Sequence, residues 1–134
     1  MGLGDEDGKL SFFIPLFPPS MNRFYMMIPS RSQVLLRPEI VKWKSDAKLF
    51  IPEFKVEGEP KLSLTLWFHS ADWFYKNGKV RRLDSPNLEK VVIDSLFERW
   101  GLDDCLIWHK ESWKVTDSER KIRVEVGLMN DCPV

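Results

Sequence analysis

The chain has 134 residues, of which 43% are hydrophobic, so it is long enough to bury one core and predicts a single domain. Lysine plus arginine equals aspartate plus glutamate at 20 each, so the overall charge gives no support for a nucleic-acid partner. Two cysteines exclude a disulfide framework and a cysteine-based zinc site, and no apolar run approaches the ~20 residues that span a bilayer. We expect a cytoplasmic protein with no membrane partner and no organic cofactor.

The first part of the chain predicts a tail, a strand and a long connection. Residues 1–8 are rich in glycine and acidic side chains, and we expect a flexible tail in front of one domain at 9–134. Residues 10–17 alternate and predict a strand, with Pro15 at an edge or a bulge. Residues 21–38 keep no period and predict an exposed loop.

Two helices and a strand are predicted next. Residues 38–51 predict a helix that begins at a proline and ends before Pro52. Residues 61–68 alternate with a period of two, which is typical of a strand with one buried face. A second helix is predicted from Ser85, which can cap it, to Gly101, which can end it. The predicted apolar stripes are Ile40, Trp43, Ala47 and Phe50 on the first helix, and Leu88, Val91, Val92 and Leu96 on the second.

The last two strands are predicted at 105–115 and 121–128, around a polar turn at 116–119. The order β-α-β-α-β-β predicts an α+β domain in which two helices pack on one mixed sheet and the last two strands form a hairpin. Trp108 and Trp113 fall on opposite faces of their strand. At least one of them therefore needs cover from outside the sheet, which favours a dimer.

One polar stripe of the second helix carries candidate functional groups. Asn87, Lys90, Asp94 and Glu98 follow spacings of three, four and four, which place them on one side of the helix, separate from its apolar face. They can face a common cleft. The ordinary alternative is that Lys90 and Asp94 form an exposed ion pair with no chemical role.

Further carboxylates lie at both ends of this helix. Asp84 precedes it, and Asp103 and Asp104 follow it. If the chain returns towards the start of the helix, Asp84 and Asp104 offer hard oxygen ligands for Mg²⁺, which can activate water for attack on a phosphodiester. Lys90 can then neutralise a phosphate oxygen in the transition state. The alternative is that these aspartates only cap turns and complement the helix dipole.

Three blocks of sequence together resemble one known family. They are Pro18-Pro19-Ser20-Met21-Asn22-Arg23-Phe24-Tyr25, then Asp84-x-x-Asn87-Leu88-x-Lys90-x-x-x-Asp94, then Gly101-Leu102-Asp103-Asp104. In this order and spacing, the blocks resemble the RusA-like family of Holliday junction resolvases. The resemblance covers most of the chain from residue 10 to residue 128.

The resemblance implies a homodimeric, Mg²⁺-dependent endonuclease, with Mn²⁺ as a possible substitute, of bacterial or phage origin. Such an enzyme binds four-way DNA junctions and nicks two strands symmetrically in recombination and repair. Asp84 and Asp104 match metal-binding aspartates of the family, and Lys90 matches a catalytic lysine. Asn87 and Asp103 match supporting positions of the family, and we expect Asp103 to be a third metal-binding residue beside Asp84 and Asp104.

The chain departs from the family pattern at one position. The family has Asp-x-Asp-Asn where this chain places Pro86, so one carboxylate is missing, and Glu89 would have to swing from the first turn of the helix to replace it. Two alternatives to a junction-resolving nuclease therefore stay open. One is a catalytically weakened protein that binds branched DNA, and the other is a non-enzymatic, partner-binding domain.

A local basic strip leads to this region in spite of the zero net charge. Lys76, Lys79, Arg81 and Arg82 lie close together before the second helix, and Arg23 lies in the first block of the resemblance. Their binding to DNA phosphates would weaken steeply as salt concentration rises.

Three consecutive aromatic residues, Trp73, Phe74 and Tyr75, lie beside the basic strip. They can stack on unpaired bases at the centre of a junction. They can equally belong to the core or to a dimer contact, where aromatic side chains are common.

Overall fold

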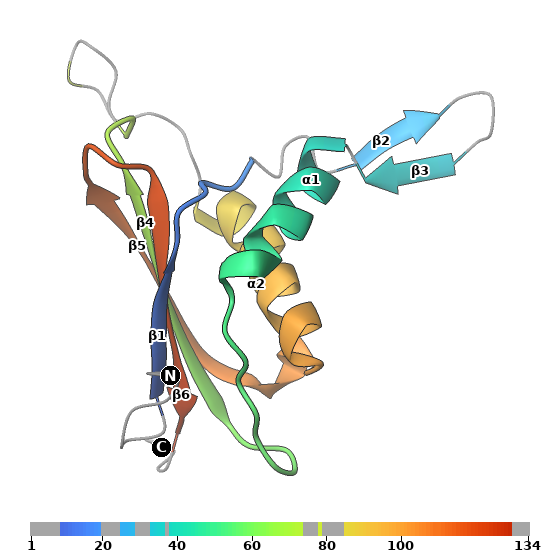
Figure 1. Ribbon diagram of the computed structural model, residues 1–134, viewed down its shortest axis with the longest axis vertical. Helices are drawn as coiled ribbons and strands as arrows, with labels where there is room; N and C mark the ends of the chain where they lie inside the picture. Colours follow the sequence, from blue (N-terminus) through green and yellow to red (C-terminus); the bar gives the residue numbers. More distant parts are fainter. Residues whose placement is uncertain are drawn as a thin grey trace.

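A four-stranded mixed sheet carries both helices on one of its faces (Figure 1). The α+β order of strands and helices predicted for a RusA-like domain is confirmed. Within the residues described below, no helix combines the length and the apolar character needed to cross a bilayer. The computed structural model describes residues 9–19, 25–28, 33–36, 38–73, 78 and 85–129. Its elements are β1 (Lys9–Ile14), β2 (Tyr25–Ile28), β3 (Gln33–Leu36), α1 (Pro38–Ala47), η3 (Lys48–Phe50), β4 (Leu62–Ser70), α2 (Ser85–Trp100), η4 (Asp104–Leu106), β5 (Ile107–Thr116) and β6 (Lys121–Leu128).

The predicted hairpin of the last two strands is wrong, because β4 lies between them. The strand order is β1-β6-β4-β5, with β5 parallel to β4 and β6 antiparallel to it. The long strand β4 is thereby paired along both edges. Its burial alternates from residue to residue, because successive side chains point to opposite faces of the sheet. The unit β4-α2-β5 is a parallel strand pair with a helical connection.

The connection between β5 and β6 crosses over the end of β4. It has to span two strand spacings, roughly 10 Å, which the residues 117–120 can cover in an extended form. The backbone N–H of Asp117 donates to the carbonyl oxygen of Ser70 at 3.1 Å, and the carboxylate Oδ2 of Asp117 lies 2.9 Å from Nδ1 of His69. A short polar turn has the same sequence signature in a hairpin and in this crossing, so the local pattern could not separate them.

Asp117 predicts a pH-dependent contribution to stability. The backbone N–H of Glu119, and then His69, hold the pKa of Asp117 below its ordinary value of 3.8. Because the folded pKa is lowered, the ionised carboxylate stabilises the fold above the pKa of the unfolded chain, and this stabilisation is lost as pH falls through the lowered value. We expect Asp117→Asn to have a lower free energy of unfolding than wild type at neutral pH. This difference in free energy should disappear as pH falls below about 4. Urea unfolding from neutral to acidic pH measures this, and a pH-independent difference would contradict it.

The stretch predicted as an irregular loop contains a second small sheet. Strands β2 and β3 pair antiparallel, with Tyr25 opposite Leu36 and Ile28 opposite Gln33. The hairpin lies beyond the end of α1, apart from the main sheet (Figure 1). Each strand has only four residues, which is too short for a period of two to be recognised in the sequence.

The core lies between the sheet and the two helices. Leu62, Leu64, Leu66 and Phe68 of β4 are all fully buried, as the alternation predicted. The stripes of both helices are confirmed except at Phe50, which is 44% exposed because α1 ends at Ala47 and the chain continues as η3. Strand β1 ends directly before Pro15, which has no N–H to offer to a strand ladder. The core members on α2 and the other strands are Leu88, Val91, Val92, Ile93, Leu96, Phe97, Leu10, Ile14, Ile122, Val124 and Val126.

Candidate active site

The end of α2 reverses the chain and sends the following residues back along the helix. Gly101 has a φ of 68°, and its N–H donates to the carbonyl of Glu98 at 3.3 Å, while the N–H of Leu102 donates to the carbonyl of Phe97 at 3.0 Å. This pair of hydrogen bonds is the Schellman motif, which requires the left-handed conformation that glycine adopts without strain. The predicted helix end at Gly101 is therefore confirmed, and Asp104 follows only three residues later.

The strain at Gly101 gives a direct test of this turn. We expect Gly101→Ala to lower the free energy of unfolding by about 1 kcal/mol, because a Cβ atom disfavours the left-handed conformation. Gly101→Asn should cost less, since asparagine tolerates that conformation better than alanine. Urea unfolding of the two variants measures the difference, and an alanine variant as stable as wild type would show that the turn is not held as described.

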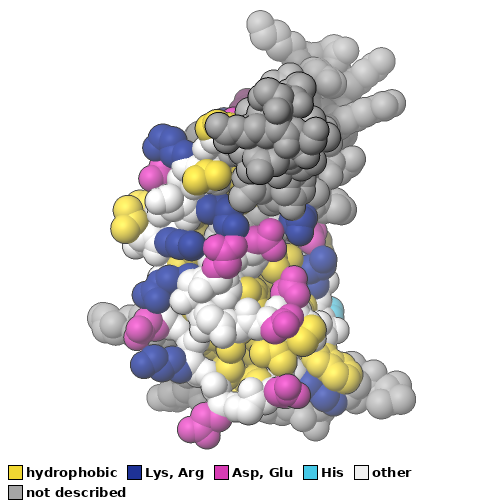
Figure 2. Space-filling model, turned by 90° about the vertical axis from the view of Figure 1, so that its right-hand side faces the viewer, with side chains coloured by type: hydrophobic (Ala, Val, Ile, Leu, Met, Phe, Trp, Pro, Cys, Tyr) yellow, Lys and Arg dark blue, Asp and Glu magenta, His cyan; other side chains and the backbone are white. Residues whose placement is uncertain are grey.

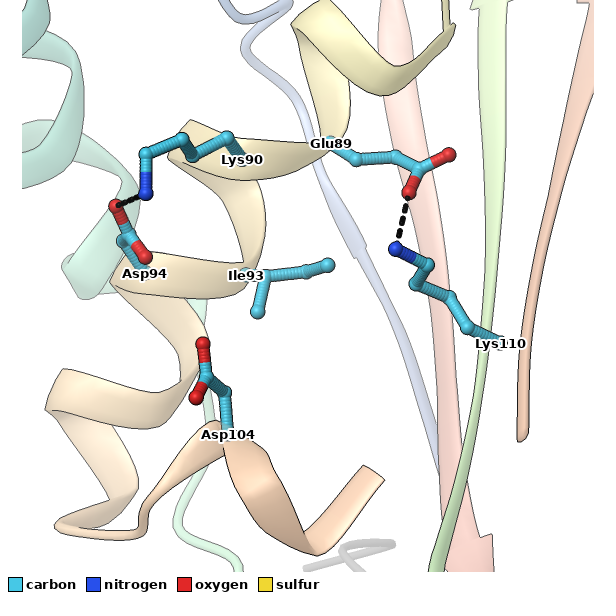
Figure 3. A pocket seen from close by; sticks show the side chains of 6 residues that line it. All are labelled: Glu89, Lys90, Ile93, Asp94, Asp104 and Lys110. Carbon is cyan, nitrogen blue, oxygen red and sulfur yellow. Dashed lines mark ion pairs between the residues drawn. The ribbon is translucent and has the colours of Figure 1, made fainter. Parts of the chain in front are cut away.

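Asp104 comes to lie beside the second and third turns of α2. It lines a hollow of about 200 Å³ together with Glu89, Lys90, Ile93, Asp94 and Lys110. Figure 3 shows Asp104 pointing towards α2 from the segment that follows the helix. Lys90 and Asp94 form an ion pair on the helix, with Nζ 3.6 Å from Oδ2. A carboxylate distant from Lys90 in sequence thus shares one hollow with the lysine and with a second carboxylate.

Asp103 and Asp104 have different surroundings. The carboxylate Oδ1 of Asp103 accepts a hydrogen bond from the backbone N–H of Cys105 at 2.9 Å, which caps the short helix η4. This backbone hydrogen bond holds the pKa of Asp103 below its ordinary value. A separate hydrogen bond between the exposed Cys105 thiol and the Asp103 carboxylate raises the pKa of the thiol. Asp103 therefore fixes the turn that carries Asp104.

Glu98, the last member of the predicted polar stripe, faces α1. Its carboxylate accepts hydrogen bonds from Lys44 and, at 3.1 Å, from Lys48. Burial opposes ionisation of Glu98, but the two lysines outweigh it and lower its pKa. Glu98 and Asp94 also line a hollow of about 300 Å³ together with Asp103 and Asp104.

Glu89 is a buried carboxylate tied to strand β5. Its side chain is 9% exposed. Its carboxylate accepts a hydrogen bond from Oγ of Ser112 at 2.6 Å and forms an ion pair with Nζ of Lys110 at 3.0 Å. Figure 3 shows it directed towards β5, away from Lys90 and Asp94. Glu89 therefore lines the hollow from the side of β5, where Lys110 and Ser112 hold its carboxylate.

Sequence reasoning missed Lys110, although two signals were present. Glu89 precedes Val92, Ile93 and Leu96 by three, four and seven residues, which places it on the apolar side of α2, and a buried charge requires a partner. Lys110 lies on β5 opposite Leu64 of β4, whose side chain is buried under the helices. A basic residue at a helix-facing position of a strand is the expected partner.

A second hollow adjoins the first. It has a volume of about 340 Å³ and is lined by Ile93, Asp104, Ile107, Trp108 and Lys110. On the helix side of the molecule, basic and acidic side chains intermingle, and apolar surface lies among them (Figure 2). The region around Asp104 therefore combines carboxylates, lysines and an exposed aromatic ring.

Several predicted site residues lie outside the described part of the structure. Asn87 is described only as part of the helix α2, without its side chain. Trp73, by contrast, is resolved as a core residue: it is 3% exposed, and its Nε1 donates to the carbonyl of Val115 at 2.8 Å. Phe74 and Tyr75 belong to the undescribed residues. Among the predicted metal-binding and DNA-binding residues, those outside the description are Asp84, Lys76, Lys79, Arg81, Arg82 and Arg23.

The donor set of the first hollow fits a hard divalent cation. Asp94 and Asp104 both line it, and Mg²⁺ binds through one or two carboxylates while it keeps several waters. Within the described ranges, no cluster of three or more His, Cys, Asp or Glu side chains could hold a metal ion. Asp84, the other expected ligand, is not among those residues.

One family of known proteins matches the chain over most of its length. No curated protein matches the chain in a sequence search. The family model of the endodeoxyribonuclease RusA matches residues 15–127, which include α1, α2, every strand from β2 to β5, and most of β6. Because this match covers most of the chain, the protein belongs to the RusA endodeoxyribonuclease family.

Proposed function

We propose that this protein is a Mg²⁺-dependent endonuclease that resolves Holliday junctions by paired, symmetric nicks. Membership of the RusA family implies a nuclease of the Holliday junction resolvase type and a branched DNA substrate. The observation that carries the proposal is the return of Asp104 to the hollow that Lys90 and Asp94 also line. Carboxylates and an amine next to one another are the groups that a metal-dependent phosphodiester hydrolase requires.

In this proposal, Asp84 and Asp104 would hold the metal, in line with the general metal dependence of the family, and Asp103 supports them. A bound Mg²⁺, or Mn²⁺ in its place, would supply an activated water and offset charge on the attacked phosphate. Asp103 supports the site by fixing the turn through its hydrogen bond with Cys105. The cation therefore depends on residues from both ends of α2.

Lys90 and Asn87 would act from the first turns of α2. The ammonium group of Lys90 lies at the hollow, where it can neutralise a phosphate oxygen as charge develops. Its ion pair with Asp94 holds it on that side of the helix. Asn87, one turn earlier, would support the substrate or Lys90 as an uncharged hydrogen-bonding group.

DNA would be held by the basic strip of Lys76, Lys79, Arg81 and Arg82, together with Arg23. Two copies of the chain, related by two-fold symmetry, would place equivalent sites on two strands of a junction. We further propose that the protein acts in the cytoplasm of a bacterium or of a phage-infected cell. Binding through the strip should weaken strongly as salt rises.

One specific observation supports a second candidate function. Pro86 replaces a family aspartate, and Glu89 is held by Lys110 and Ser112 rather than being available to replace it. A protein with one ligand fewer would bind branched DNA but cut it slowly. This alternative shares the DNA-binding residues of the first proposal and differs only in catalysis.

Cleavage of a synthetic four-way junction separates the candidates. The proposed resolvase should nick the junction in Mg²⁺ at symmetric positions and leave a linear duplex of the same sequence intact. A binding protein would shift the junction in a mobility assay and leave it uncut at every Mg²⁺ concentration. Failure to bind the junction at low salt would favour the partner-binding domain instead.

A further inference from the structure

An exposed tryptophan stands at the start of β5, directly beside Asp104. Trp108 is 58% exposed and lines the hollow of about 340 Å³ together with Asp104 and Lys110. The strand register shifts here, because Leu62 pairs with Ile107 and the next residue of β4 pairs with His109. Trp108 is thus the extra residue of a bulge, a feature that redirects a side chain away from the regular pleat.

One lysine lies over this indole ring, and a second lines the same hollow. Nζ of Lys61 lies 4.4 Å from the ring centroid of Trp108, and Lys110 lines the same hollow. Lys110 is also anchored, because its Nζ lies 3.0 Å from Oε1 of the buried Glu89. An exposed indole ring with one ammonium group over it and a second lysine in the same hollow has the composition of a site for a nucleotide, with a flat base and a charged phosphate.

We propose that Trp108, Lys61 and Lys110 form a subsite for one unpaired nucleotide of the DNA substrate, next to the phosphodiester bond that is cut. The base stacks on the indole ring of Trp108, and the lysines neutralise its phosphates. This proposal rests on the proposed function for the identity of the ligand. Branched DNA provides unpaired bases near its crossover, whereas a linear duplex keeps its bases stacked.

The position of Trp113 offers a matched control on the same strand. Trp113 is 54% exposed, close to the value for Trp108, but it pairs in register with Trp67 of β4. Since Leu66 and Phe68, on either side of Trp67, are buried under the helices, Trp67 and Trp113 lie on the opposite face of the sheet. Loss of Trp113 removes a similar exposed ring at a distance from Asp104.

The test measures binding without cleavage, in EDTA at low salt. The four-way junction carries a fluorescent label at one end and 2-aminopurine at the crossover. The anisotropy of the end label gives the Kd, and quenching of the 2-aminopurine reports base stacking. We expect Trp108→Leu to raise Kd by about 5- to 150-fold, as for loss of one stacked base, and to abolish the quenching. Trp108→Phe should keep most of both signals, and Trp113→Leu should behave as wild type.

Two results would overturn the subsite and leave the proposed function intact. One is a Trp108→Leu variant that binds and quenches as wild type does, while wild type cleaves junctions. The other is a Trp108→Leu variant whose sedimentation shows a changed oligomeric state, because Trp108 would then be a contact between subunits. If wild type itself does not bind the junction, the proposed function and the subsite both fail.

Lys61 provides an independent variant that does not disturb the buried Glu89. We expect Lys61→Met to make the plot of log association constant against log salt concentration less steep. The slope should change by about 1, as for the loss of one phosphate contact. Lys42→Met is the control, because Lys42 is an exposed residue of α1 that pairs with Asp46. An unchanged salt slope for Lys61→Met would contradict the placement of the phosphate.

Discussion

Asp104→Asn should reduce Mg²⁺-dependent cleavage of a four-way junction by at least about 100-fold, which corresponds to ~2.7 kcal/mol of transition-state stabilisation. Asparagine keeps the size and shape of the side chain but removes the negative charge that would hold the cation. Because Asp104 is exposed at a hollow, the substitution should leave the stability of the fold nearly unchanged. Junction binding in EDTA should also be unchanged, so the loss would lie in the chemical step.

Asp46→Asn is the matched control for this experiment. Asp46 is a partly exposed aspartate of α1 that forms an ion pair with Lys42, at 2.7 Å. The Asp46→Asn variant should cleave the junction at the wild-type rate at every Mg²⁺ concentration of a titration. Equal activity of Asp104→Asn and wild type at all Mg²⁺ concentrations would remove Asp104 from the site.

Phe68→Ala should lower the free energy of unfolding by about 3–5 kcal/mol, since it deletes a large buried ring and leaves a cavity. Among the residues that the structure describes, Phe68 is the largest side chain that is fully buried. It lies on the central strand β4 and packs edge to face against Phe17, with ring centroids 6.2 Å apart. A domain of this size has a total stability of roughly 5–15 kcal/mol, so the variant should be marginally folded. Urea unfolding monitored by circular dichroism measures the change.

Leu49→Ala is the corresponding control at the surface. Leu49 is 82% exposed in η3, so its truncation should change the free energy of unfolding by less than about 0.5 kcal/mol. If Phe68→Ala were as stable as Leu49→Ala, the central position of β4 in the core would be wrong.

The sequence predicted those features that depend on neighbours along the chain. The period of two in β4 and the capped, amphipathic pattern of α2 are local, and the structure confirms both elements. The end of α2 could be predicted because the turn requires a left-handed backbone conformation, which glycine, here Gly101, adopts without strain. The sequence left open whether the aspartates after α2 return towards the start of the helix, and the structure places Asp104 in one hollow with Lys90.

Features that depend on long-range pairing could not be predicted. The insertion of β4 between β5 and β6 is decided by how three strands share one sheet, and the turn at 117–120 is compatible with either arrangement. The role of Trp73 was also undecided in the sequence, because the ring packs against Phe17 and its N–H donates to Val115, and both partners are distant in sequence. Lys110 was missed since its partner, Glu89, lies on another element.

The central claim is that carboxylates from both ends of α2 share one divalent cation. Calorimetric titration of the DNA-free protein with Mn²⁺ tests it most directly, with wild type, Asp84→Asn, Asp104→Asn and the control Asp46→Asn. We predict that wild type and Asp46→Asn bind Mn²⁺ alike and that Asp84→Asn and Asp104→Asn each bind it at least about ten-fold more weakly. Wild-type Mn²⁺ affinity in either Asp84→Asn or Asp104→Asn would contradict a shared cation.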